Sequence, residues 1–123
     1  MLKKIVLAAA LVAVSAIPAF AQSCSEPIPP VAPNGATANK AQISAAAHDA
    51  NLFIKASDDY QGCLITDLNN QKDAAKKDKK ELDPAIGAAV TAKVDANQAM
   101  KERVGSEFTT AYAAFKKAHP GEQ

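Results

Sequence analysis

The stretch KKDKKELDPAIGAAV, residues 76–90, decides the fold that the sequence predicts. Before its turn, residues 39–80 contain no proline and are rich in Ala, Lys, Gln and Leu, which is typical of a long helix. Asp83 followed by Pro84 has the form of an N-cap and a first helical residue, so a second helix is expected to begin there. Only residues 81–83 then separate the two helices, and so short a connection predicts an antiparallel hairpin.

The outer ends of the two helices are also marked. Asn39, with Gln42 three residues later, has the pattern of a capping box and begins the first helix. The pair Pro120–Gly121 ends the second helix. The helical hairpin is therefore expected over residues 39–119, with residues 120–123 as a tail.

Apolar residues recur every three or four positions on both predicted helices, which is the spacing of a coiled-coil-like seam. A connection centred on Leu82 would place Phe53 opposite Ala111 and Tyr60 opposite Val104. After residue 21 the chain contains only 19 Val, Ile, Leu, Met, Phe or Tyr residues, which suits a thin two-helix seam better than a thick core. The expected seam positions are Ile43, Ala46, Ala50, Phe53, Tyr60, Leu64 and Leu68 on the first helix and Ile86, Val90, Met100, Val104, Phe108, Ala111 and Phe115 on the second.

The N-terminus has the pattern of a secretory signal peptide. Two lysines precede an apolar run over residues 5–17, and the small-x-small sequence AFA then predicts cleavage between Ala21 and Gln22. Residues 1–21 would be removed. An uncleaved membrane anchor is disfavoured because the run is short for a membrane span and is interrupted by Pro18.

Composition and charge narrow the class of protein. A chain of 123 residues, 48% apolar, 22% charged and 5% aromatic, allows one small domain and excludes a multidomain enzyme. Loss of the leader leaves 12 basic and 13 acidic residues, a net charge of −1, which has no long-range attraction for nucleic acid. No later apolar run approaches membrane length, so no membrane span is expected after leader removal.

A proline-rich arm is expected over residues 22–38. Pro27, Pro29, Pro30 and Pro33 fix the backbone φ angle and remove hydrogen-bond donors, so this segment predicts an extended, polyproline-like conformation. The arm contains Cys24, and its preceding residues do not match the usual pattern for lipidation of that cysteine.

The two cysteines predict a disulfide between the arm and the first helix. From Asn39 to Cys63 the helix rises about 36 Å, and the 15 residues from Cys24 to Asn39 could span about 46 Å. The arm can therefore run back along the helix to Cys63. Gly62 would let another backbone approach beside the bridge. The expected shelf for the arm is the stripe formed by Ala45, Leu52, Ala56 and Cys63.

A disulfide in an exported chain indicates an oxidising compartment, so the protein is expected to be periplasmic or secreted. The leader, the cysteine–proline arm ending in Asn34–Gly35, and the element Tyr60-Gln61-Gly62-Cys63-Leu64 together resemble a group of small exported helical proteins of Gram-negative bacteria, chiefly alphaproteobacteria. The resemblance covers roughly residues 1–68. It implies a periplasmic address and the disulfide, and it implies no activity.

No catalytic, cofactor-binding or metal-binding constellation stands out. His48 and His119 lie on different predicted helices without ligands at metal-binding spacing, so surface positions are expected. The adjacent carboxylates Asp58 and Asp59 point about 100° apart on a helix and do not converge. The lysines over residues 69–81 alternate with acidic residues and are expected to form a solvated helix end rather than a binding patch.

These observations favour a non-enzymatic envelope protein, a hairpin that acts as an adaptor, interaction or structural module. Ala47, Ile54 and Ile65 lie about 110° from the seam and form the expected interaction face, for a protein partner in the cell envelope or for a second copy of the chain. Two alternatives remain open. One is a periplasmic protein that binds a small ligand or metal, and the other is a secreted toxin or inhibitor.

Overall fold

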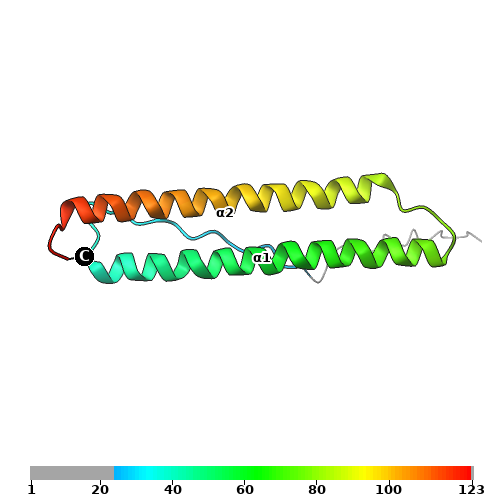
Figure 1. Ribbon diagram of the computed structural model, residues 1–123, viewed down its shortest axis with the longest axis horizontal. Helices are drawn as coiled ribbons and strands as arrows, with labels where there is room; N and C mark the ends of the chain where they lie inside the picture. Colours follow the sequence, from blue (N-terminus) through cyan, green and yellow to red (C-terminus); the bar gives the residue numbers. More distant parts are fainter. Residues whose placement is uncertain (1–23, 123) are drawn as a thin grey trace, which may run out of the picture.

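The computed structural model describes residues 24–122, which form an antiparallel pair of long helices with an extended arm beside them (Figure 1). Helix α1 spans Lys40–Lys77 and helix α2 spans Pro84–Ala118. The predicted all-α hairpin is confirmed. The predicted signal peptide and its cleavage site at Ala21 and Gln22 lie outside the described residues.

Both helices begin where the sequence predicts. The Asn39 side chain accepts a hydrogen bond from the Gln42 backbone N–H, and the Gln42 side chain accepts one from the Asn39 backbone N–H, each at 2.9 Å. This is a complete capping box. The Asp83 carboxylate accepts a hydrogen bond from the Ala85 N–H at 2.9 Å, with Pro84 as the first residue of α2.

Helix α1 ends three residues earlier than expected, at Lys77 instead of Lys80. Lys79 adopts a left-handed backbone conformation with a φ of 54°, and its N–H donates to the Lys76 carbonyl oxygen at 3.0 Å. The Lys80 N–H donates to the Ala75 carbonyl oxygen at 2.9 Å. These two bonds form a Schellman motif, which satisfies the last carbonyls and turns the chain out of the helix. The connection therefore covers residues 78–83.

The register of the helices differs from the expected one. Val104 packs with Ala50 and Phe53, whereas the sequence placed Val104 opposite Tyr60 and Ala111 opposite Phe53. Helix α1 reaches farther than the start of α2 at the connecting end, so the turn is not symmetric about Leu82 (Figure 1). The two helices are shifted along each other by one heptad relative to the expected register. A shift of one heptad brings the same helical faces together, so the spacing of apolar residues cannot distinguish the two registers.

The arm runs antiparallel to α1, from the disulfide at Cys24 to a turn beside the start of α1 (Figure 1). Its exposure repeats every three residues, as expected for a polyproline-like segment with three residues per turn. Ser25, Ile28, Val31 and Asn34 are exposed, whereas the residues Pro27, Pro30 and Pro33 are each half-buried. One face of the arm therefore lies against the helices and the other faces solvent.

The buried residues are confined to one half of the hairpin. In the clasped half, defined as residues 24–64 and 97–122, the arm lies beside the helices and two apolar clusters form. In the tip half, residues 65–96, no residue is buried. Neither described helix has a stretch long and apolar enough to cross a membrane. The buried apolar residues are Ala38, Ile43, Ala50, Phe53, Tyr60, Leu64, Val104, Ala111 and Phe115.

Candidate interaction surfaces

The arm is joined to α1 by the predicted disulfide between Cys24 and Cys63, whose Cα atoms are 5.7 Å apart. The bridge closes a loop with a sequence separation of 39 residues. Both cysteines are half-buried. The arm is thereby anchored at the middle of the hairpin and also at its base, where the chain enters α1.

One expectation about the arm is wrong, and a second holds only in part. Gly62 does not make room for another backbone, because a Cβ atom added there would meet nothing within 4 Å. The proposed shelf is covered only in part: Pro27, Ile28 and Pro30 of the arm line a recess with Leu52 and Ala56. Leu52 nevertheless remains 52% exposed, and Ala45 and Ala56 are exposed. The arm then crosses from α1 toward α2, where residues 31–35 line a recess with α2 residues.

The close approach occurs at Gly35. A Cβ atom built on Gly35 would lie only 1.8 Å from the Ala111 carbonyl oxygen, so any side chain here would collide with the α2 backbone. The preceding Asn34 closes the turn, because its side chain accepts from the Ala36 N–H at 3.0 Å and its carbonyl accepts from the Ala38 N–H at 2.9 Å. The arm is therefore held against α2 at one end and bonded to α1 at the other.

A buried polar layer crosses the seam at the middle of the hairpin. The Asn97 amide donates to the Ser57 hydroxyl at 3.2 Å, and the Gln61 amide donates to Asn97 Oδ1 at 2.8 Å. Ser57 is fully buried and Asn97 nearly so, and no buried side-chain N or O atom among the described residues lacks a partner. The sequence reasoning missed this layer, although a serine and an asparagine at seam spacing were a signal for it.

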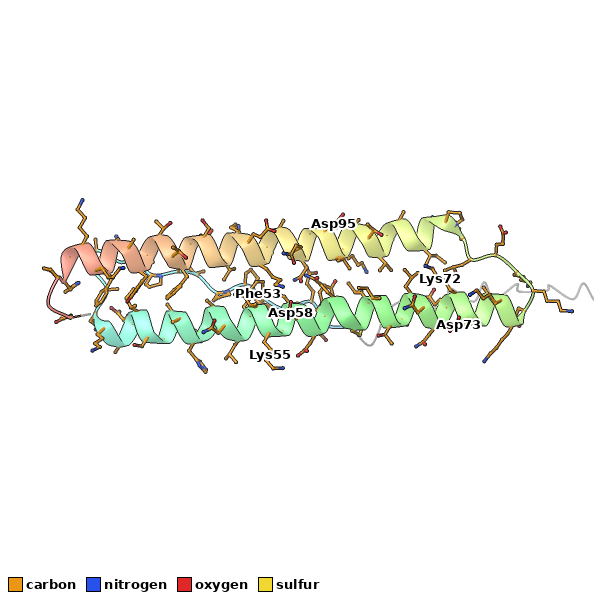
Figure 2. All side chains as sticks on the ribbon, viewed as in Figure 1. Phe53, Lys55, Asp58, Lys72, Asp73 and Asp95 are labelled. Carbon is orange, nitrogen blue, oxygen red and sulfur yellow. A yellow bond between two sulfur atoms is a disulfide. The ribbon has the colours of Figure 1, made fainter. Side chains whose placement is uncertain are left out.

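The adjacent carboxylates diverge as predicted. Asp58 pairs with Lys101 across the two helices, while Asp59 pairs with Lys55 one turn earlier on α1 at 3.2 Å. In this part of α1, Figure 2 shows Phe53 directed toward α2 and Lys55 directed away from it. The Asp58–Lys101 pair thus supports the register that the polar layer sets.

Tyr60 is buried one turn from the disulfide. Its burial, and secondly the negative charge of Glu26 on the arm, raise the pKa of the Tyr60 phenol above its ordinary value. Glu26 itself is exposed and lies between Cys24 and Ile28 on the arm.

The histidines occupy separate places. His48 is exposed on α1. His119 caps the C-terminus of α2, where its ring stacks on Phe115 with centroids 4.6 Å apart and its Nδ1 lies 3.2 Å from the Phe115 carbonyl oxygen. Within residues 24–122, no group of three or more His, Cys, Asp or Glu side chains is arranged to hold a metal ion.

The expected interaction face is spread along the outside of α1. Ile65 is 49% exposed, while Ala47 and Ile54 are half-buried. At 100° per residue, Ile65 lies about 200° around α1 from Cys63, away from the side that carries the arm. Lys76 near the end of α1 and Lys80 in the connection are both exposed.

Two further features lie on the arm side of the molecule, and the sequence reasoning did not single them out. Ile28 and Val31, one polyproline turn apart on the arm, are 90% and 92% exposed. A recess of about 260 Å³ lies between the helices beyond the disulfide. We call it the tip recess, and its lining residues are Leu64, Asp67, Ala85, Ile86, Ala89, Val90 and Lys93.

Comparison of the chain with protein-family models, with curated proteins and with solved structures found no match in any of the three.

Proposed function

We propose that this chain is a non-enzymatic, exported helical-hairpin protein, periplasmic or secreted, that serves the cell envelope as an interaction or structural module. The observation that carries the proposal is the Cys24–Cys63 disulfide, which ties the arm to α1. Disulfides persist in oxidising compartments, and this one follows directly after a segment with the pattern of a cleaved leader. The resemblance to small exported proteins of Gram-negative bacteria points the same way.

A binding role suits the shape of the molecule. Two helices and an arm leave much of each helix open to solvent, and branched apolar side chains stand on the open surface. Because the arm is held at both ends, the clasped half presents a rigid surface that loses little conformational freedom on association. The face of Ala47, Ile54 and Ile65 is the proposed site for an envelope partner.

The export part is tested by producing the full chain, leader included, in a Gram-negative host. The periplasmic fraction should contain a protein that begins at Gln22 and has a mass two hydrogens below that of the reduced form. Retention in the cytoplasm with two free thiols would contradict the proposal.

The binding part is tested by affinity capture from envelope extract under non-reducing conditions. The Ile54→Asp, Ile65→Asp double variant should lose a partner that the wild type captures, because a buried charge is costly at an apolar interface. A matched control is the Asn51→Asp, Thr66→Asp double variant, which adds the same charge at exposed neighbouring positions of α1. Equal capture of the partner by all three proteins would show that this face does not bind it.

A further inference from the structure

The arm face of the molecule carries both an apolar projection and an apolar hollow. The projection is the pair Ile28 and Val31, which are almost fully exposed even though both ends of the arm are held. The hollow is the tip recess, whose volume of about 260 Å³ would hold several waters at about 30 Å³ each, and hence an aliphatic side chain. Exposed apolar features of this kind mark association surfaces.

The tip recess continues the groove in which the arm lies. The arm reaches Cys63, and the recess begins at the next residue, Leu64, on the same side of the hairpin. If the leader is removed, only Gln22 and Ser23 precede Cys24, a length of about 6 Å at about 3.1 Å per residue. From Leu64 to Lys77, α1 continues for about 20 Å. With the leader removed, the chain's own N-terminus is too short to cover the tip half.

One charge beside the projection, Glu26, is complementary to one charge in the recess, Lys93. Glu26 is exposed and lies two residues from Ile28 on the arm. Two charged side chains line the tip recess: Asp67, which accepts a hydrogen bond from the Gln71 amide at 2.8 Å, and Lys93. Glu26 and Lys93 have no ion pair among the salt bridges of the described residues. A surface that inserted Ile28 into a recess of this kind would bring Glu26 toward Lys93.

Positions along α1 show how a second copy meets both features. Ile28 lies at the level of Leu52 and Ala56, and the recess lies at the level of Leu64 and Asp67, about 12 residues or 18 Å farther along. If a two-fold axis passes midway between these two levels, near Tyr60, the projection of one copy faces the recess of the other. In such an isologous dimer the same contact forms twice, because the projection of each copy meets the recess of the other. No surface is left to add a third copy.

We propose that two copies of this chain associate antiparallel through their arm faces, with Ile28 and Val31 of each copy seated in the tip recess of the other. Val31, about 9 Å along the arm from Ile28, then approaches the Ile86 end of the recess. The association supplies the tip half with the apolar cover that it lacks in the monomer. This proposal is independent of the adaptor role, which uses the opposite side of α1.

The test is sedimentation equilibrium of the disulfide-bonded protein, residues 22–123, over a concentration series, with helicity followed by circular dichroism. We expect a monomer–dimer equilibrium. Glu26→Lys or Lys93→Glu alone should each weaken association about tenfold or more, because each places like charges together at both symmetric contacts. The Glu26→Lys, Lys93→Glu double variant should restore association, which a merely structural defect would not do.

A matched pair of substitutions separates the two sides of the molecule. Ile28→Asp should abolish the dimer without loss of helicity, since Ile28 is 90% exposed in the monomer. Ile65→Asp, the same change on the other side of α1, should leave the dimer intact. The proposal is overturned by a monomer at every concentration, by a dimer that only Ile65→Asp disrupts, or by the absence of rescue in the charge-exchange variant.

Discussion

Gly35 is the residue at which the arm comes nearest to a helix backbone. Gly35→Ala should lower the free energy of unfolding by about 1–3 kcal/mol, because the new Cβ would sit 1.8 Å from the Ala111 carbonyl oxygen and force the arm away from α2. Urea denaturation monitored by circular dichroism measures the change.

Gly62→Ala is the matched control. An added Cβ meets nothing within 4 Å there, and the residue lies inside α1, so stability should rise by about 0.5–1 kcal/mol. If Gly35→Ala raised stability as Gly62→Ala does, the close approach at Gly35 would be wrong. The sequence marks both glycines, but only the path of the arm shows which one faces a backbone.

Asn97 is the centre of the buried polar layer, since it contacts both Ser57 and Gln61. Asn97→Ala should cost about 1–3 kcal/mol, because the Ser57 hydroxyl loses its donor in a fully buried position. The measurement is the midpoint of urea denaturation. Asn51→Ala, at an exposed position of α1, serves as the control and should be neutral or slightly stabilising. Equal effects would mean that the polar layer contributes nothing to the seam.

At the scale of the elements, the C-terminal end of α1 depends on a lysine in the left-handed region. Lys79→Gly should stabilise the protein by about 1 kcal/mol, since glycine adopts a φ of 54° without the steric cost that a Cβ imposes. Lys77→Gly, two residues earlier and still helical, should instead destabilise by a similar amount. Thermal melting of both variants checks the sign, and a loss of stability in Lys79→Gly would argue against the Schellman turn.

The elements show how far local sequence can predict this fold. The starts of both helices follow from side chains within three residues of the cap, Asn39 with Gln42 and Asp83 with Pro84, and these were predicted correctly. The end of α1 depends on the left-handed conformation of Lys79. Glycine is the usual residue at such a position, and its absence left the helix end unmarked in the sequence. The register depends on Asn97, Ser57 and the shape of the connection, and a heptad shift leaves the apolar pattern unchanged.

The features of the candidate surfaces differ in how far the sequence predicts them. The disulfide followed from reach along a straight helix, so Cys24 and Cys63 could be paired from the sequence. The exposure of Ile28 and Val31 could not be predicted from the sequence, because it depends on which side of the arm, with three residues per turn, faces the helices. The tip recess depends on the register, which the apolar repeat does not determine.

For the whole molecule, the structure divides the hairpin into a clasped half with a core and a tip half without buried residues. Amide hydrogen exchange at low protein concentration should therefore show protection lower by at least about tenfold over residues 65–96 than around Phe53 and Val104. Uniform protection along both helices of the monomer would contradict this division. At high concentration, the proposed dimer predicts that protection rises in the tip half first.

The bridge between Cys24 and Cys63 gives this thin hairpin much of its stability. The most direct measurement is the free energy of unfolding of the Cys24→Ser, Cys63→Ser variant against the wild type, both without reductant. A loop with a sequence separation of 39 residues predicts a loss of about 4 kcal/mol, because the crosslink restricts the unfolded chain. Equal unfolding free energies for the two proteins would contradict the account and leave the arm as a passive extension of the helices.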